Sequence, residues 1–211
     1  MAERIEAPGI RGWLHRPAGA PVAALGITHG AGSNCDSPLL LSVAEAFAEN
    51  GFVALRYNLP YRQQRPSGPP VGNAGPRDRD GIREVSKFLR EQTPGVPLYL
   101  SGHSYGGRQT TMLAAEDASV ADALLLLSYP LHPPGQPEKP RTDHFPGLRV
   151  PSLFVHGSRD EFGEAAELEE ATQLLPARHA LQVVEGAPHG LPPKLAGQIV
   201  DWFVTFTLLP S

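Results

Sequence analysis

One short motif restricts the fold of this chain more than any other: residues 102–106, Gly-His-Ser-Tyr-Gly, directly after the apolar run 96–100. A serine between two glycines at this spacing is typical of a nucleophile elbow, a sharp turn from a strand into a helix, where a Cβ at either glycine would collide with neighbouring backbone. The same string also occurs in surface turns. Here, however, residues 108–115 read as a helix with Met112 and Ala115 on its packed side. We therefore predict that Ser104 projects its hydroxyl above a sheet.

Apolar runs alternate with helical patterns along the chain. Strands are predicted at residues 13–14, 23–28, 52–57, 98–101, 123–129, 152–156 and 181–185, and helices at 39–49, 80–92, 106–116, 164–174 and 195–206. The first helix places Leu40, Val43, Ala44 and Phe47 on one stripe, and Gly51 is placed to end it. This alternation predicts an α/β fold with a mostly parallel central sheet and helices on both faces.

The length of 211 residues favours a single α/β-hydrolase-type domain over residues 1–211, too short for a large cap domain. The 22 glycines and 23 prolines lie between the apolar runs and show no repeat. Two proline-rich stretches, 58–79 and 129–149, are predicted to be irregular loops. Both follow strands whose C-terminal ends should share the edge of the elbow, so we expect them to overhang Ser104.

A serine hydroxyl needs a base to take its proton and an acid to orient that base. Behind a nucleophile elbow these groups follow later in the chain, acid first and histidine second, each in a loop after a strand. Asp160 follows the apolar run 152–155, and His189 follows 181–184 in a loop of small residues. Asp160 is therefore the predicted acid and His189 the predicted general base. Asp160 also reads as a helix N-cap, and its neighbour Glu161 is the alternative acid.

The remaining histidines receive structural interpretations. Those in polar or proline-rich surroundings are predicted to be solvated: His15, His132, His144 and His179. His103 is expected to face away from the tip of the elbow and to pack or support the site. His156 is expected to end a strand and make a local hydrogen bond.

The run 23–28 leads into residues 29–34, His-Gly-Ala-Gly-Ser-Asn, whose glycines allow main-chain N–H groups to approach a ligand. We predict an oxyanion hole formed by the backbone N–H of Tyr105 and that of Ala31 or a near neighbour. Such a turn also suits a phosphate loop. No Lys-Ser/Thr pair follows it, and no Gly-x-Gly-x-x-Gly occurs, so nucleotide binding is disfavoured.

Substrate-binding residues are less evident in the sequence. Predicted to line a small apolar acyl pocket are Tyr61, Leu131 and Phe162, with Tyr105 and Pro133 as further candidates. Arg62, Arg108 and Arg141 suit either a substrate carboxylate or surface ion pairs, and Arg108 is expected to brace a neighbouring loop. The spacing of histidines, cysteine and carboxylates predicts no metal site, and the mechanism requires no cofactor.

Several longer stretches carry a family resemblance: 28–32, 37–40, 56–62 (Arg-Tyr-Asn-Leu-Pro-Tyr-Arg), 104–108, 129–135 (Tyr-Pro-Leu-His-Pro-Pro-Gly) and 156–160. With them the chain resembles the small α/β-hydrolases of the testis-expressed-protein-30 and NSL-complex-subunit-3 type, which are similar to dienelactone-hydrolase-like esterases. The resemblance implies the fold and the positions Ser104, Asp160 and His189. Dienelactone hydrolases proper use a cysteine nucleophile, whereas Cys35 here lies in the oxyanion-loop region. His103 before the serine is more typical of esterases and lipases than of non-catalytic family members.

Together these patterns predict a serine carboxylesterase that acts on small-molecule, short-acyl esters. A thioesterase or peptidase of the same fold stays open, as does a non-catalytic scaffold, which the intact set of three residues disfavours. A net charge of −4 without a basic run argues against nucleic acid as a partner, and no apolar segment reaches the length of a membrane span. One cysteine and no secretory signal favour a cytoplasmic protein. The sequence leaves the oligomeric state open.

Overall fold

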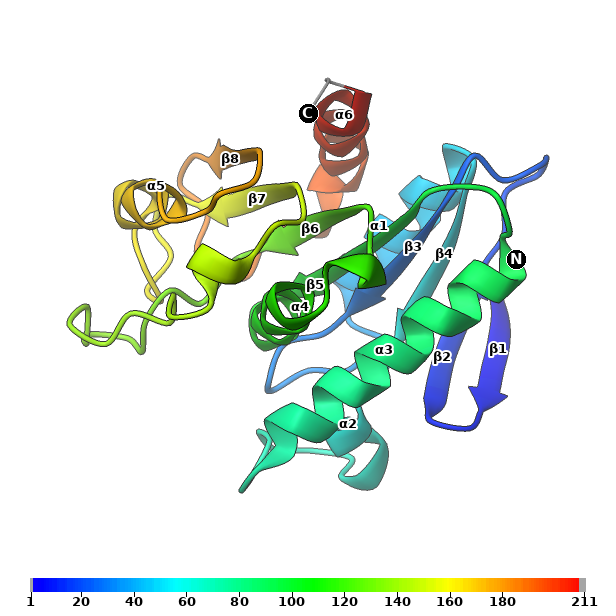
Figure 1. The fold of residues 1–211 in the computed structure, drawn as a ribbon, viewed down its shortest axis with the longest axis horizontal. Coiled ribbons are helices and arrows are strands. Elements are labelled where there is room, and N and C mark those ends of the chain that lie inside the picture. Colours follow the sequence, from blue (N-terminus) through cyan, green and yellow to red (C-terminus); the bar gives the residue numbers. More distant parts are fainter. Residues whose placement is uncertain (1, 209–211) are drawn as a thin grey trace.

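The computed structural model describes residues 2–208, and within them one eight-stranded sheet runs through the molecule (Figure 1). The strands are β1 (Ala2–Ala7), β2 (Ile10–His15), β3 (Ala23–Thr28), β4 (Phe52–Tyr57), β5 (Leu98–His103), β6 (Ala123–Leu127), β7 (Ser152–Gly157) and β8 (His179–Val184). Their order is β1-β2-β4-β3-β5-β6-β7-β8. Only the pairs β1–β2 and β2–β4 are antiparallel, so the expected mostly parallel sheet is confirmed.

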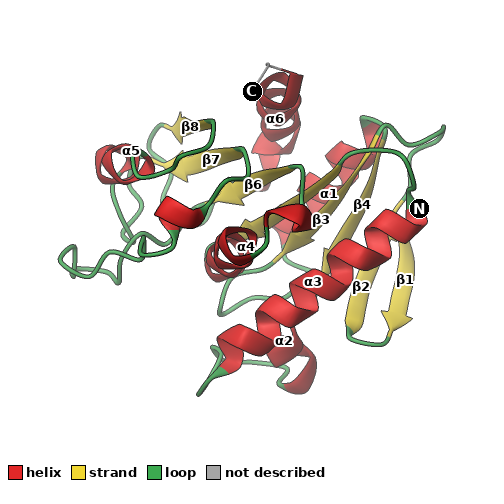
Figure 2. Cartoon of the chain, in the orientation of Figure 1, coloured by secondary structure: helices red, strands yellow, loops and turns green. Residues whose placement is uncertain are grey.

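Helices cover both faces of this sheet, as Figures 1 and 2 show. The longer helices are α1 (Pro38–Glu49), α3 (Ala74–Gln92), α4 (Tyr105–Glu116) and α6 (Ala196–Leu208), and the shorter ones α2 (Pro60–Gln64) and α5 (Ala165–Thr172). α3 and α4 pack together on one face, while α1 and α6 pack together on the other. The buried apolar side chains accordingly form two clusters, one beneath each helix pair. Burial of apolar surface on both faces is the main contribution to the stability of this layer arrangement.

The local patterns explain why these elements form. β3, β4, β6 and β7 are buried at every position, which fits central strands covered on both faces. In α1 the predicted stripe from Leu40 to Phe47 faces the core. Gly51 follows the helix with φ +89°, a conformation that favours glycine and ends α1.

The structure differs most from the predicted boundaries in the first proline-rich stretch and at the β1 edge of the sheet. Residues 58–79, predicted to be an irregular loop, contain α2 and the first turn of α3, which begins six residues before the predicted start at 80. Pro76 is compatible with that first turn because N–H groups there have no partner within the helix. The strand predicted at 13–14 spans Ile10–His15 and pairs with the unpredicted edge strand β1.

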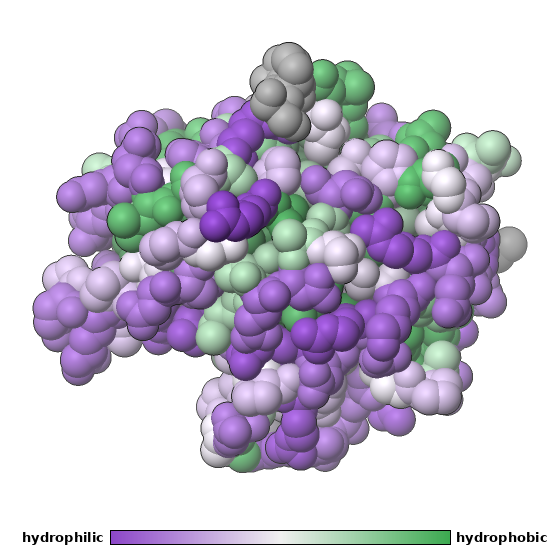
Figure 3. Space-filling view, in the orientation of Figure 1, coloured by the Kyte–Doolittle hydropathy of each residue, from purple (hydrophilic) through white to green (hydrophobic). Residues whose placement is uncertain are grey.

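The exposed side of α3, in the foreground of Figure 3, is mainly hydrophilic.

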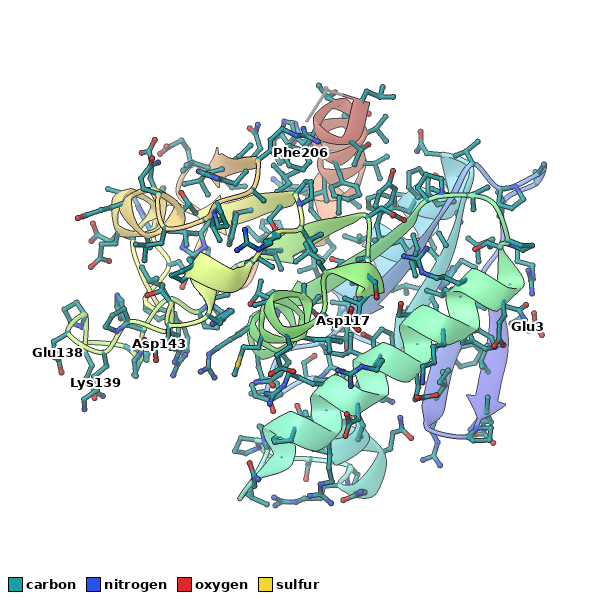
Figure 4. The ribbon with its side chains drawn as sticks, viewed as in Figure 1. Glu3, Asp117, Glu138, Lys139, Asp143 and Phe206 are labelled. Carbon is teal, nitrogen blue, oxygen red and sulfur yellow. The ribbon has the colours of Figure 1, made fainter. Side chains whose placement is uncertain are left out.

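No inserted cap domain is present among residues 2–208, as expected from the length. The second proline-rich stretch runs from the end of β6 toward the short 3₁₀ turn Phe145–Gly147, and Glu138 and Lys139 point into solvent at its outer tip (Figure 4). No helix in the described part of the chain is long and apolar enough to cross a membrane.

Candidate active site

Ser104 occupies the sharp turn between β5 and α4, as the elbow motif predicts. Its backbone has φ 52° and ψ −118°, a left-handed conformation that costs a non-glycine residue roughly 1–3 kcal/mol. A Cβ at Gly106 would lie 2.6 Å from the carbonyl oxygen of His29, and one at Gly102 would overlap the backbone at Gly106 and Gly107. The two glycines therefore allow the close approach of helix and strand that holds the serine in this geometry.

The structure brings Ser104, Asp160 and His189 together. Nε2 of His189 lies 2.7 Å from Oγ of Ser104, and Nδ1 lies 2.9 and 2.8 Å from Oδ1 and Oδ2 of Asp160. The three residues come from the ends of β5, β7 and β8, which are parallel and meet at one edge of the sheet. The ionised carboxylate only accepts hydrogen bonds, so it favours the tautomer with the proton on Nδ1. Nε2 is then an acceptor that faces the serine hydroxyl.

Asp160 is held in place on every side. Its side chain is fully buried, and Oδ1 also accepts the backbone N–H of Phe162 at 2.9 Å. It is not the N-cap of α5, because Glu164 holds that position in a capping box with Glu167. Glu161, the alternative acid, is exposed. The arrangement therefore favours Asp160 over Glu161.

Two neighbouring rings fix the imidazole of His189. The ring of Phe162 lies against it with centroids 4.2 Å apart, and that of His103 lies 5.3 Å away. Nε2 of His103 donates to the main-chain carbonyl of His189 at 3.1 Å. Burial lowers the pKa of His103 to about 4, so this ring is neutral near neutral pH and supports the loop. His156 donates from Nε2 to the carbonyl of Gly163 at 2.7 Å, the expected local hydrogen bond.

Two residues that line a hollow with Ser104 have a free main-chain N–H group. The N–H groups of these residues, Ala31 and Tyr105, have no acceptor among residues 2–208. Tyr105 is the first residue of α4, where N–H groups have no partner within the helix. Free donors of this kind beside a nucleophile suit a developing oxyanion.

Side chains behind the loop at Ala31 fix its position. The hydroxyl of Tyr61 donates to the carbonyls of Ala31 and Gly30 at 2.8 and 3.2 Å. Arg62 donates to the carbonyls of Ser33 and Ala31, at 2.6 and 3.2 Å. The carbonyl of Gly30 and the N–H of Ala31 belong to one trans peptide group and point in opposite directions. The hydrogen bond from Tyr61 to this carbonyl therefore leaves the N–H of Ala31 free on the side away from Tyr61. Tyr61, expected in the acyl pocket, therefore lies behind the oxyanion loop instead, and Arg62 forms neither a surface ion pair nor part of the hollow.

Sequence reasoning missed a buried carboxylate beneath this loop. Asp78 is fully buried and accepts the hydroxyl of Tyr105 at 2.7 Å and the backbone N–H of Tyr61 at 3.0 Å. Burial raises the pKa of Asp78, although the two hydrogen bonds oppose the shift. Asp78 thus connects both sides of the predicted oxyanion hole. Its charged neighbours Arg77, Arg79 and Asp80 gave no signal to separate it from a solvated helix face.

The hollow beside Ser104 has a volume of about 330 Å³ and is lined by Ala31, Ser104, Tyr105, Arg108, Pro130, Arg141 and Phe162. Of the residues predicted to line the acyl pocket, Phe162 and the further candidate Tyr105 lie there. Leu131 does not, because it is buried and lines another hollow with Pro137 and Leu174. Arg108 was expected to brace a loop. Its side chain instead lines the hollow and makes no hydrogen bond within residues 2–208. Of the two long loops, only 129–149 reaches the hollow.

Three histidines predicted to be solvated are largely buried. His15 accepts a hydrogen bond from Nε of Arg56 on the paired strand, His132 donates to Glu167, and His144 donates to Thr111. Burial lowers the pKa values of His15 and His144 to about 4. Their partners are distant in the sequence, so local polarity was misleading. His179 is half-buried on β8.

Two features of the described chain bear on metal and cysteine chemistry. Residues 2–208 contain no cluster of three or more histidine, cysteine, aspartate or glutamate side chains arranged to hold a metal ion. Cys35 is buried, and burial raises the pKa of its thiol to about 11. A thiol of this kind is unreactive at neutral pH.

Comparison with known families gives a direct assignment. A family model described as "Alpha/beta hydrolase domain" matches residues 21–199, most of the chain. The chain belongs to this α/β-hydrolase family. The α/β-hydrolase fold explains the strand order and the position of the elbow, which follows the central strand β5.

Solved structures share this fold over their whole length. TT1662 from Thermus thermophilus is 24% identical, with a TM-score of 0.78, and 100% of this chain and 99% of that chain are covered. Est1E from Butyrivibrio proteoclasticus is 18% identical, with a TM-score of 0.76 and 99% of each chain covered. Dienelactone hydrolase from Anabaena variabilis is 21% identical, with a TM-score of 0.77 and 97% of each chain covered. At such identities the likeness concerns the fold of this α/β-hydrolase.

Proposed function

We propose that this α/β-hydrolase is a serine carboxylesterase that cleaves small, short-acyl esters through an acyl-enzyme on Ser104. The observation that carries the proposal is the pair of hydrogen bonds made by His189, Nε2 to Ser104 at 2.7 Å and Nδ1 to Asp160 at 2.8 Å. A structural role does not require a strained serine, a free acceptor nitrogen and two unpaired N–H donors to face one hollow. This combination favours catalysis over a scaffold.

In the first half of the reaction, Oγ of Ser104 forms a bond to the ester carbonyl carbon, and its proton moves to Nε2 of His189. The carbonyl oxygen becomes an oxyanion that accepts hydrogen bonds from the N–H groups of Tyr105 and Ala31. Asp160 stabilises the imidazolium. The bond to the alcohol oxygen then breaks, and Nε2 gives its proton to the leaving alcohol.

In the second half, water attacks the acyl-enzyme carbonyl and gives a proton to Nε2 of His189. The bond to Oγ breaks, Ser104 recovers the proton, and the carboxylic acid leaves. Each oxyanion donor contributes roughly a hundredfold to a thousandfold in rate. The scheme uses water, the three side chains and the two main-chain N–H groups.

A fluorophosphonate probe tests the assignment without knowledge of the substrate. Its tetrahedral adduct resembles the acyl-transfer transition state, so an activated serine reacts and an ordinary serine does not. We expect one adduct by intact-protein mass spectrometry, mapped to Ser104. His189→Ala should slow labelling by orders of magnitude while the thermal midpoint stays nearly unchanged. His179→Ala is the control, because His179 lies at the start of β8 away from Ser104, and it should be labelled at the normal rate. Absence of labelling in folded protein would favour a scaffold.

A series of p-nitrophenyl esters tests the specificity. The hollow of about 330 Å³ and the absence of a cap among residues 2–208 leave little surface to bury a long chain. Turnover should therefore be highest for acetyl to butyryl esters and decrease with longer acyl groups. Peak turnover on a long-chain ester contradicts the short-acyl assignment and leaves the mechanism intact.

A further inference from the structure

Two arginines line the hollow that contains Ser104. Arg108 lies on α4, one turn after the serine, and Arg141 belongs to the loop that follows β6. Both side chains are half-buried. The ion pairs of arginines within residues 2–208 include neither of them, being those of Arg4, Arg16, Arg56, Arg79, Arg83 and Arg90. The hollow thus contains two positive charges without a counterion from the described chain.

Both guanidinium groups have N–H donors without an acceptor in the described part of the chain. Nε of Arg108 is buried and has no acceptor in the described part of the chain, and the guanidinium of Arg141 donates there only to the carbonyl of Pro130, at 3.3 Å. Arg62, by contrast, donates to four main-chain carbonyls. Burial of an unpaired guanidinium is unfavourable, and every N–H of a structural arginine normally finds an acceptor. Arg108 and Arg141 therefore differ from an arginine that supports the fold.

The two guanidinium groups also repel each other. Both line the same hollow, and burial, followed by the charge of Arg108, lowers the pKa of Arg141. Two acids from the surrounding elements form no ion pair with them in the described part of the chain: Asp143 is exposed on the outer loop (Figure 4), and Asp78 accepts a hydrogen bond from Tyr105. A bound anion would offset this repulsion and supply acceptors to both guanidinium groups.

The position of His189 indicates which part of an ester reaches the arginines. His189 gives its proton to the alcohol, so the alcohol must leave beside its imidazole and loop. A second hollow of about 280 Å³ lies along that loop, lined by Gly190, Leu191 and Pro193 together with Pro38, Leu39 and His103 and without a charged side chain. The acyl group is left for the hollow with the oxyanion donors and the arginines.

We propose that the substrate is a small ester whose acyl part carries a carboxylate, bound by Arg108 and Arg141. The inference rests on the proposed esterase function and specifies its substrate class. A planar guanidinium matches a carboxylate with two parallel hydrogen bonds, and charge-assisted bonds are the stronger kind. The alcohol part is uncharged and small.

Two methyl esters of matched shape test this. Monomethyl succinate carries a carboxylate where methyl 4-methylpentanoate carries an uncharged isopropyl group. Hydrolysis is followed by titration of the released acid at constant pH, and the quantity compared is the ratio of the two kcat/KM values. We expect a ratio of roughly ten to a hundred in favour of monomethyl succinate. The ratio should decrease at high salt, because salt screens the attraction.

Variants assign the preference to these residues. Arg108→Gln and Arg141→Gln should each reduce the ratio by at least about tenfold, whereas Arg149→Gln, an exposed arginine outside the hollow, should leave it unchanged. The ratio is measured within each variant, so partial unfolding, which lowers the rates on the two esters equally, does not change it.

The outcomes separate the inference from the function. Hydrolysis of both esters at equal rates, or a ratio insensitive to both arginines, overturns the inference and leaves the esterase intact. Hydrolysis of neither ester, without labelling of Ser104, refutes the proposed function itself. Preference for 3-acetoxypropanoate, an isomer of monomethyl succinate with the carboxylate on the alcohol, overturns the assignment to the acyl side.

Discussion

Asp160→Asn tests the hydrogen-bond logic of the site more sharply than removal of Ser104 does. The substitution keeps the shape of the side chain and removes its charge. Oδ1 accepts the backbone N–H of Phe162 at 2.9 Å, so the amide oxygen must occupy that position. The amide nitrogen then replaces Oδ2, which lies 2.8 Å from Nδ1 of His189. An amide nitrogen only donates, and a proton on Nδ1 would place two donors 2.8 Å apart, so the tautomer in which Nδ1 accepts is favoured although the oxygen at Oδ1 also lies 2.9 Å from Nδ1.

The consequence appears on the other side of the ring. The remaining proton of the neutral imidazole moves to Nε2, 2.7 Å from Oγ of Ser104, where an acceptor is required. His189 in this tautomer cannot take the serine proton. A loss of about 10,000-fold in kcat is the expected magnitude for the wrong tautomer, which corresponds to about 5 kcal/mol of transition-state stabilisation.

The rate of fluorophosphonate labelling of Ser104, together with ester turnover, measures this effect in purified protein. Circular dichroism should show an unchanged fold, because the amide is isosteric with the carboxylate. Glu161→Gln is the matched control, since Glu161 is exposed next to Asp160. A rate for Asp160→Asn within tenfold of the unsubstituted protein would refute the tautomer argument, and a large loss in Glu161→Gln would identify the other acid.

Two further predictions concern stability. Gly106→Ala places a Cβ 2.6 Å from the main-chain oxygen of His29, which cannot move freely, so the free energy of unfolding should decrease by about 1–3 kcal/mol in a denaturant titration. Gly197→Ala is the control, because Gly197 lies in α6 with open space around it, and this variant should be neutral or slightly stabilising. Equal stability of the two variants contradicts the packing argument. Burial lowers the pKa of the fully buried His29 to about 4. Between about pH 6.5 and pH 4 the unfolded chain therefore binds a proton at this residue and the folded chain does not. Stability should be complete above pH 6.5 and decrease as the pH falls toward 4, by about 2 kcal/mol at pH 5 from His29 alone; a thermal midpoint that is constant between pH 7 and 5 would show that the ring is protonated without cost.

Local patterns predict much of this fold and the neighbourhood of the site. The elbow motif, Asp160 and His189 each follow an apolar run, and parallel strands bring the ends of such runs to one edge of a sheet. The spacing of apolar residues was sufficient to locate α1 and its end at Gly51. These signals lie within about ten residues of the feature they predict.

Features that depend on distant partners were predicted poorly. Tyr61 reads as a pocket residue until the carbonyl of Ala31, 30 positions away, is placed against its hydroxyl. His15 reads as solvated until Arg56 is brought beside it by strand pairing, 41 positions away. Arg108 carries the same uncertainty, because a sequence does not show that an arginine lacks a partner. Charged and polar side chains can bond to water, to the main chain or to other side chains, whereas apolar side chains are stabilised mainly by burial.

The hydrogen bond from Ser104 to His189 joins residues 85 positions apart, across β6 and β7. Closing so long a segment costs chain entropy that only completed pairing of the intervening strands can offset. On the proposed mechanism, a chain that has formed β5 and α4 but not yet added β8 has a serine without its base and should not react. Labelling of Ser104 by a phosphonylating probe should therefore count only the molecules in which β8 has paired with β7. The chemistry of one hydroxyl thus provides a measure of folding for the whole sheet, in a crude extract as well as in a purified sample.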